Sequence, residues 1–199
     1  MQSIEVTEYR MTFPSDPAYP VQYVFSLQLK NGMNISIRPI RPEDEAAMAR
    51  FHESLSDRSV YLRYFHMEKL SSRVAHSRLA RRCFIDYDLE MALIAEYFNP
   101  EPGRNEIIAV GRLIRAPEGS EAEIALIVSD KFQKCGLGAE LMRRLIQVGR
   151  DEKLQRIVAT VLPENMGMRV LASRHGFKPV KSEDLSSIQL ALDLSEASV

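Results

Sequence analysis

The chain has 199 residues, of which 45% are hydrophobic and 27% are charged, and its formal net charge is −1. This composition is ordinary for a globular protein with a buried core, and the near-neutral charge does not favour a nucleic-acid partner. No apolar run approaches the roughly 20 residues that span a membrane, and the first ten residues lack the pattern of a signal peptide. The two cysteines and four histidines are scattered, which predicts no metal site. We therefore expect a cytoplasmic protein without a membrane or nucleic-acid partner.

Residues 1–30 are predicted to form an N-terminal arm, and residues 31–196 a single domain. The arm is rich in proline and carries Tyr19, Tyr23 and Phe25, so we expect its aromatic rings to pack on the domain and the arm to end in a short strand. Three roles stay open for it: the remnant of a linker, the contact of a homodimer, or a part of the acceptor site.

The domain begins with one strand and three helices, continues as an antiparallel meander, and ends with alternating strands and helices. Alternating apolar residues predict the strands, and apolar residues spaced by three and four predict the helices. In chain order the predicted elements are strand 33–40, helices 41–55, 56–67 and 71–84, strands 90–98, 107–116 and 122–129, helix 136–153, strand 156–162, helix 164–176 and strand 186–194. This order is typical of the α+β class.

Two glycines, Gly136 and Gly138, stand where the long helix must begin, directly after the apolar run that ends at Val128. The start of a helix exposes unpaired N–H groups with partial positive charge, and glycine lets an anion approach them. The segment is therefore a candidate pyrophosphate cradle, and an ordinary strand-to-helix turn is the alternative. The chain contains neither G-x-x-x-x-G-K-[ST] nor G-x-G-x-x-G.

The segment Gln133–Gly138 matches the Q/R-x-x-G-x-G/A pattern of the GNAT superfamily of N-acetyltransferases, and the later segment ENMGMRVLASRHGF resembles that family's second motif. The stretches IRPIRPEDE, YLRYF, FIDYDLEMALIA and AEIALIV are similar to the acetyltransferase domain of bacterial protein lysine acetyltransferases, which is commonly fused to an acyl-CoA synthetase-like region. The resemblance implies the GNAT fold: a mixed, mostly antiparallel sheet of about six to seven strands flanked by helices, with strands four and five splayed.

The resemblance implies acetyl-CoA as the co-substrate. Its pyrophosphate would bind the amides between Gln133 and Ala139, and its pantetheine arm would lie along the splayed strand, pairing like an added strand. An asparagine at the start of the later helix would contact the cofactor, or serve only as an N-cap. The implied cofactor-binding residues are Leu126, Val128, Gln133, Lys134, Cys135, Gly136, Leu137, Gly138, Ala139 and Asn165.

Acetyl transfer to a lysine needs a base, because only about 0.1% of an unperturbed lysine amine is neutral near pH 7.4. Glu123, on the strand AEIALIV, is the candidate, and it matches the catalytic glutamate of the related enzymes. We expect it to be buried among apolar neighbours, which favours proton uptake. The alternative is a glutamate at the mouth of the strand that is solvated or paired with Arg112 or Arg115, and Glu121 is the second choice for the base. In many members of the family a tyrosine serves as the general acid that protonates the CoA thiolate. This chain has Ala172 at that position, so the thiolate would leave unprotonated or take its proton from water.

The acceptor side is predicted to involve Asp86, Tyr87 and Tyr64. An ordinary acidic turn explains Asp86 and Tyr87 equally well, and a packed core cluster is favoured for the aromatic residues of YLRYF. The basic run RVAHSRLARR is predicted to be a solvated helix face, and contact with the CoA 3′-phosphate or with an acidic partner is the alternative. The predicted function is direct transfer of an acetyl group from acetyl-CoA to an amine, in particular a protein lysine such as one on an acyl-CoA synthetase. The alternatives are a small-amine acetyltransferase and a non-catalytic acyl-CoA-binding regulatory module.

Overall fold

A computed structural model describes residues 19–29, 31–117, 119–182 and 184–195. In chain order these residues form η1 Val21–Tyr23, β1 Phe25–Gln28, β2 Asn34–Pro39, η2 Pro42–Asp44, α1 Glu45–Glu53, α2 Asp57–Tyr64, α3 Leu70–Arg73, α4 His76–Cys83, β3 Glu90–Asn99, β4 Arg104–Arg115, β5 Glu121–Val128, η3 Asp130–Phe132, α5 Leu137–Asp151, β6 Arg156–Val161, α6 Met166–Arg174, β7 Lys178–Val180 and β8 Ile188–Asp193.

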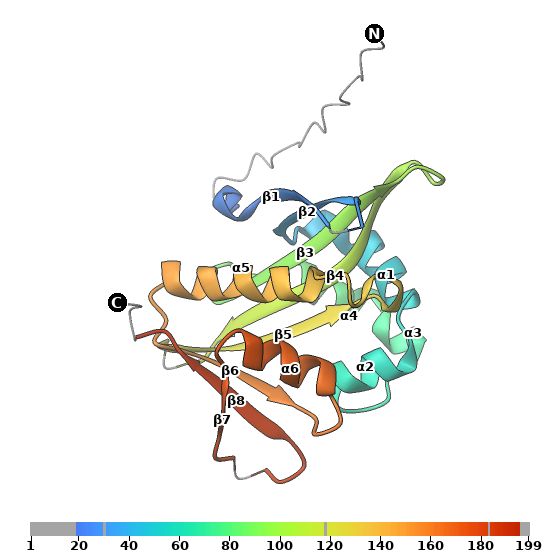
Figure 1. Ribbon diagram of the computed structural model, residues 1–199. Coiled ribbons are helices and arrows are strands. Elements are labelled where there is room, and N and C mark those ends of the chain that lie inside the picture. The colour runs from blue at the N-terminus through green and yellow to red at the C-terminus, as the bar shows by residue number, and fades with distance from the viewer. Residues whose placement is uncertain (1–18, 30, 118, 183, 196–199) are drawn as a thin grey trace.

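The described strands form one sheet of eight, in the order β1-β2-β3-β4-β5-β6-β8-β7 (Figure 1). All neighbours are antiparallel except β5 and β6, which are parallel and connected by α5. This confirms a mixed, mostly antiparallel sheet flanked by helices. The prediction of six to seven strands missed β7, a three-residue strand at the sheet edge that contains a proline.

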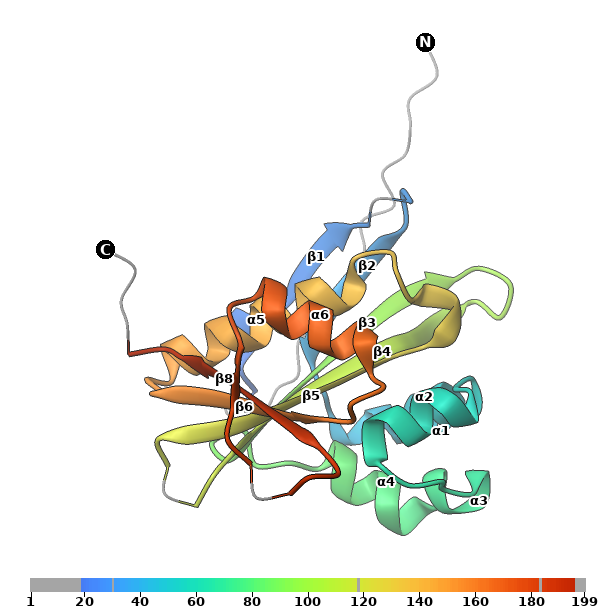
Figure 2. The same cartoon turned by 60° about the horizontal axis from the view of Figure 1, so that its bottom comes forward.

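The helices cover both faces of the sheet, as Figure 2 shows, with α5 and α6 on one face and α1 to α4 on the other. Strand alternation explains the two cores. On β5, Ile124 belongs to the cluster that includes Leu141 and Leu145 of α5, whereas Ile127 belongs to the cluster that includes Phe51 of α1. Residues 123, 125 and 127 of β5 therefore face the α1–α4 side.

The described end of the predicted arm, from residue 19 onward, is part of the fold. Its aromatic side chains pack as expected: Tyr19 and Tyr23 are buried, and the Arg144 guanidinium lies 3.5 Å from the centroid of the Phe25 ring. The hydroxyl of Tyr19 donates a 2.9 Å hydrogen bond to the carbonyl of Pro39. The predicted short strand is β1, which pairs with β2. The rest of the arm, residues 1–18 and residue 30, lies outside the described residues.

The predicted helix 71–84 is instead two helices, α3 and α4, separated at Val74 and Ala75. The β-region backbone of Ala75, with φ −60° and ψ 130°, turns the chain so that Leu79 and Cys83 of α4 can enter the core. Its basic residues are also less solvated than predicted, because Arg78 and Arg82 are only partly exposed. No helix in the described part of the chain is both long and apolar enough to span a bilayer.

Candidate active site

The sheet forks between β5 and β6, counted from β2 as its fourth and fifth strands. These strands pair only from Glu121, Ala122 and Glu123 of β5 to residues 156–158 of β6. Beyond that point β6 stays with β8 along its whole length, up to Val161 opposite Ile188. The strands therefore separate immediately after Glu123, as the predicted splay requires.

The fork leaves backbone groups of β5 free to bind a ligand. The N–H of Ser129 donates to the carbonyl of Ile108 at 2.8 Å, which makes these residues a hydrogen-bonded pair between β5 and β4. Because such pairs alternate along antiparallel strands, residues 123, 125 and 127 bond to β4. The N–H and C=O groups of Leu126 and Val128 then point toward the gap, where the side chain of Gln133 donates to the Val128 carbonyl at 3.1 Å. An extended amide ligand could pair along this edge.

A cavity of about 200 Å³ occupies the fork. Its walls come from β5, from the end of β6, from the start of α6 and from the C-terminal half of α2. Its lining residues are Leu62, Arg63, Tyr64, Phe65, Glu123, Ile124, Ala125, Leu126, Thr160, Val161, Asn165 and Met168. Four residues predicted from sequence thus meet in one cavity: the candidate base, Leu126, the candidate asparagine and Tyr64.

Glu123 is exposed at this cavity, and the expectation that it would be buried among apolar neighbours is wrong. Its side chain lies on the α1–α4 face of β5, at the wall of the fork cavity. The alternative pairings are not formed either, because Arg112 pairs with Glu90 and Arg115 with Glu152. Glu121, the second choice, is half-exposed, and its carboxylate lies 3.4 Å from the guanidinium of Arg156. The carboxylate of Glu123 is thus open to an entering amine and to water.

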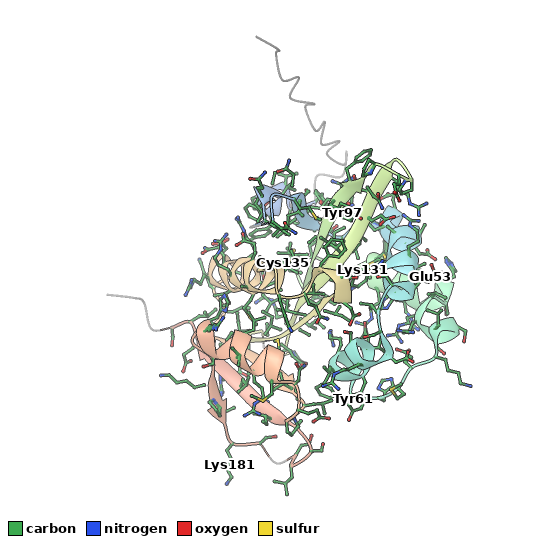
Figure 3. The ribbon with its side chains drawn as sticks, turned by 45° about the vertical axis from the view of Figure 1, so that its right-hand side comes forward. Glu53, Tyr61, Tyr97, Lys131, Cys135 and Lys181 are labelled. Atoms are coloured by element: carbon green, nitrogen blue, oxygen red, sulfur yellow. The ribbon has the colours of Figure 1, made fainter. Side chains whose placement is uncertain are left out.

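The loop before α5 has the geometry of an anion site. Gly136 is the N-cap residue of α5 with φ +94°, a conformation that favours glycine, and no side chain caps this end of the helix. The amides of Leu137, Gly138 and Ala139, in the first turn of a 15-residue helix, are therefore available to a pyrophosphate. Figure 3 shows Cys135 at the start of α5 and Lys131 on the adjacent η3.

Cys135 and Lys134, two residues of the predicted loop, differ in their surroundings. The thiol of Cys135 donates to the carbonyl of Phe132 at 2.8 Å and packs against the core, so its backbone rather than its sulfur is placed for ligand contact. Lys134 is exposed, with a left-handed backbone at φ +62°, two residues before the N-cap of α5.

Helix α2 is attached to the fork at both of its ends. At its start, Asp130 of η3 accepts hydrogen bonds from Ser56 and Ser59. At its far end, the hydroxyl of Tyr61 donates to the carboxylate of Glu164 at 3.3 Å. The amide side chain of Asn165 donates to the carbonyl of Leu62 at 3.4 Å. These contacts hold the YLRYF segment over the cavity.

Asn165 is the N-cap of α6, because its side-chain oxygen accepts a 3.1 Å hydrogen bond from the N–H of Met168. It also lines the cavity, and its contact with the cofactor stays a prediction. Asp86 and Tyr87 are placed differently. Tyr87 donates its hydroxyl to the carbonyl of Ile40 at 2.5 Å and packs edge-on against Tyr19. Asp86 accepts from the N–H of Asp88 within a turn. Neither residue lines the fork cavity.

Sequence reasoning did not single out Thr160 and Met168, which also line the cavity. Arg63 was considered only as part of the YLRYF segment, from which Tyr64 alone was chosen as a site residue. The described residues contain no cluster of three or more histidine, cysteine, aspartate or glutamate side chains that could hold a metal ion.

The model of the acetyltransferase (GNAT) domain family matches residues 34–178, and the chain belongs to this family. It is an acetyl-CoA-dependent N-acetyltransferase.

Three relatives place it more closely. Acetyltransferase PA5475 of Pseudomonas aeruginosa is 30% identical over 159 residues, which cover 80% of this chain and 83% of the relative. Acetyltransferase Pat of Mycolicibacterium smegmatis is 28% identical over 84% of this chain and 48% of the relative, so the chain spans about half the length of Pat. The crystal structure of the GNAT domain of S. lividans PAT is similar with a TM-score of 0.78 and 28% identity, over 88% of this chain and 99% of that domain.

Proposed function

We propose that this enzyme transfers the acetyl group of acetyl-CoA to the side-chain amine of a protein lysine, with Glu123 as the general base. The observation that carries the proposal is the position of Glu123 at the point where β5 and β6 separate, on the wall of the fork cavity. A carboxylate there meets an amine that approaches a thioester held along β5. Similarity to Pat and to the GNAT domain of PAT supports a protein acceptor.

The cofactor would bind at two places that the fold brings together. The uncapped start of α5, from Leu137 to Ala139, would hold the pyrophosphate. The backbone groups of Leu126 and Val128 that face the gap would pair with the pantetheine amides, as an added strand would. This arrangement directs the thioester into the cavity that Glu123 lines.

In the reaction, the neutral lysine nitrogen forms a bond to the thioester carbonyl carbon, and the carbon–sulfur bond breaks. The amine proton passes to Glu123, which is exposed and can release it to water. An N–H of β5 that faces the gap would stabilise the developing oxyanion. The position that carries a tyrosine acid in many GNAT enzymes is Ala172, which is fully buried, so the CoA thiolate would leave unprotonated or take a proton from water.

The test is turnover of acetyl-CoA, followed as free thiol, with an acyl-CoA synthetase and a panel of small amines as separate acceptors. We expect lysine acetylation of the protein, and we expect Glu123→Gln to lower kcat by roughly 10² to 10⁴ while the Kd for CoA stays unchanged. Glu121→Gln is the matched control, because it removes a carboxylate two residues earlier on the same strand face.

Three outcomes separate the parts of the proposal. Normal turnover in Glu123→Gln would remove the base assignment. Loss of turnover in Glu121→Gln alone would transfer the role to that residue. Turnover with small amines but not with protein would overturn the protein-lysine acceptor and leave the chemistry in place.

A further inference from the structure

A second, smaller cavity lies on the α1–α4 face of the sheet and shares Arg63, Tyr64 and Ala125 with the fork cavity. Its volume is about 20 Å³, which is room for about one water molecule or a small polar group. Four of its lining residues are arginines, contributed by α2, α4 and β4: Arg63, Arg78, Arg82 and Arg112. The cavity therefore concentrates positive charge directly behind the proposed reaction site.

Only part of this charge is neutralised. Arg78 pairs with Glu68, and Arg112 pairs with Glu90 and donates to the carbonyl of Arg82 at 2.7 Å. The guanidinium groups of Arg63 and Arg82 form no ion pair or hydrogen bond within the described part of the chain. Two positive charges without a carboxylate partner thus line a cavity that admits a single small group.

His52 provides an independent sign that this cavity takes a polar ligand. Its side chain lines the cavity and is almost fully buried, and its Nδ1 has no hydrogen-bond partner among the described residues. Burial, together with the charges of Arg78 and Arg73, lowers the pKa of His52 to about 4. The imidazole is therefore neutral near pH 7, held between the rings of Phe51 and Tyr64. A buried polar atom without a partner is costly, and either one bound water molecule or a polar atom of a ligand that reaches into this cavity would satisfy it.

Arg63 connects the two cavities. It is half-buried on α2, its guanidinium carbon lies 5.0 Å from the centroid of the Tyr64 ring, and it lines both the fork cavity and the arginine-lined cavity. Burial lowers the pKa of Arg63, and the charges of Arg112 and Arg82 act in the same direction, whereas Tyr64 and Glu123 act against them. An anion placed beside Arg63 would offset both effects. Among the described residues that line the fork cavity, Glu123 is the one carboxylate, and its charge acts on Arg63 without an ion pair between the two groups.

We propose that Arg63, with Arg82 behind it, forms a carboxylate-binding subsite that receives a carboxylate carried by one of the two substrates. The proposal rests on the proposed acetyl transfer at Glu123 and names a further requirement of that site. The carboxylate could belong to the acyl group of the CoA thioester, as in a dicarboxylic acyl-CoA, or to the acceptor beside its amine. Arginine suits such a ligand because its planar donors bind a carboxylate in two places.

The spacing of residues along β5 is compatible with one substrate that contacts both Glu123 and Arg63. Glu123 lines the fork cavity, Ala125 lines both cavities, and the two residues lie on the same strand face. Two residues of a strand span roughly 7 Å. A substrate held at Glu123 can therefore place a carboxylate at Arg63 when the two groups are separated by a few bonds.

The experiment compares matched ligands in wild type, Arg63→Met and Arg58→Met. Arg58 is an exposed arginine on the same helix that lines neither cavity, so its variant controls for loss of charge. The donor arm measures the Kd of succinyl-CoA and acetyl-CoA by calorimetry. The acceptor arm measures KM for two lysine peptides that differ only by Glu or Gln beside the lysine, with acetyl-CoA as donor.

We expect one arm to favour the carboxylate-bearing member by roughly 10-fold to 100-fold in wild type and Arg58→Met. We expect Arg63→Met to abolish this preference, and Arg63→Lys, which keeps the charge, to retain part of it. The arm that responds identifies which substrate carries the carboxylate. NMR titration of the His52 imidazole provides a second readout, because the bound carboxylate should raise the pKa of His52.

The proposal would be overturned if succinyl-CoA and acetyl-CoA had equal Kd values and the Glu and Gln peptides had equal KM values. A preference for the carboxylate-bearing ligand that survives in Arg63→Met would overturn it as well. Failure of the proposed function is a different result. If no peptide is acetylated, the donor arm and the His52 titration still test the subsite by binding alone. If peptides are acetylated without preference and succinyl-CoA binds no better than acetyl-CoA, lysine acetylation stands and the carboxylate subsite does not.

Discussion

The carboxylate of Asp130 accepts a 2.7 Å hydrogen bond from the hydroxyl of Ser56, a residue 74 positions earlier in the chain. It also accepts from the N–H of Ser56 at 2.9 Å and from the hydroxyl of Ser59 at 2.8 Å. Burial alone would raise the pKa of Asp130, but these hydrogen bonds lower it below its usual value. The start of α2, which carries the YLRYF segment, is thereby fastened to η3, which leads into the loop proposed to bind the pyrophosphate.

Asp130→Ala should therefore disturb both sides of the site. We expect the free energy of unfolding to fall by about 1–3 kcal/mol, because hydrogen bonds to a charged group are lost, and the Kd for CoA to rise. A double-mutant cycle with Ser56→Ala, measured by urea denaturation, should give a coupling energy above about 0.5 kcal/mol. Asp184 accepts similar bonds from Ser186 and Ser187 in the loop before β8, so Asp184→Ala is the control and should leave CoA affinity unchanged. Additive effects of Asp130→Ala and Ser56→Ala would argue against this coupling.

The two glycines of the loop should respond differently to alanine. A Cβ on Gly136 meets nothing within 4 Å, but its φ of +94° is unfavourable for alanine, so Gly136→Ala should destabilise the free protein by about 1–2 kcal/mol. A Cβ on Gly138 would lie 3.5 Å from Leu171, an ordinary contact, and alanine favours the helix. Gly138→Ala should thus keep or raise stability and still weaken CoA binding. Thermal unfolding and calorimetry with CoA separate the two effects, and unchanged CoA affinity in Gly138→Ala would contradict close approach of the pyrophosphate.

His52 should make the fold sensitive to mild acid. Its pKa is about 4 in the fold, below the ordinary value of 6.5, so between these values the unfolded chain binds a proton that the folded protein rejects. Stability must then fall as the pH drops from about 6.5 to 4, by up to roughly 3 kcal/mol from this group. His52→Gln should remove that part of the pH dependence in urea titrations at several pH values. His66→Gln, at an exposed position, should leave it intact, and a pH profile unaltered in His52→Gln would refute the assignment.

A buried ion triad joins the first strands to the helical face. The guanidinium of Arg38 on β2 lies 2.7 Å from the carboxylate of Asp44 and 3.0 Å from that of Glu96. Burial alone would lower the pKa of Arg38, but the hydrogen bonds to both carboxylates raise it above its ordinary value. Arg38→Met would leave two buried carboxylates unpaired and should cost about 3–5 kcal/mol of unfolding free energy.

The exposed pair of Arg143 and Glu140 on α5 offers the comparison for that triad. Arg143→Met should cost about 1 kcal/mol or less, as is usual for surface pairs. Equal losses of stability in Arg38→Met and Arg143→Met, measured by urea denaturation, would show that the triad does not stabilise the fold as proposed.

The local pattern of apolar and polar residues was sufficient to predict most helices and strands of this fold. The helix spacing of Leu141 and Leu145 and the apolar alternation of β5 are readable residue by residue, and both elements form where expected. The break at Ala75 was missed because nothing in the helical periodicity of residues 71–84 marks it. The strand β7 was missed because a short edge strand that contains proline shows almost no alternation of apolar and polar residues.

The candidate site also has parts that the sequence predicts and parts that it does not. Asn165 was readable because a helix N-cap has a local signature, and it occupies that position. The exposure of Glu123 depends on where β6 leaves β5, and the arginine-lined cavity is assembled from α1, α2, α4, β4 and β5. Such features arise from distant segments, so no local pattern of one segment predicts them.

The fork between β5 and β6 places an unpaired strand edge in the middle of the sheet rather than at its border. An unpaired strand edge is a template on which another chain can pair. If the pantetheine arm fills the gap, the co-substrate acts as a removable ninth strand, and the sheet is complete only during the catalytic cycle. The amides of Leu126 and Val128 should then exchange with deuterium faster in the free enzyme than in the loaded one, so each turnover would complete the sheet and then reopen the gap between β5 and β6.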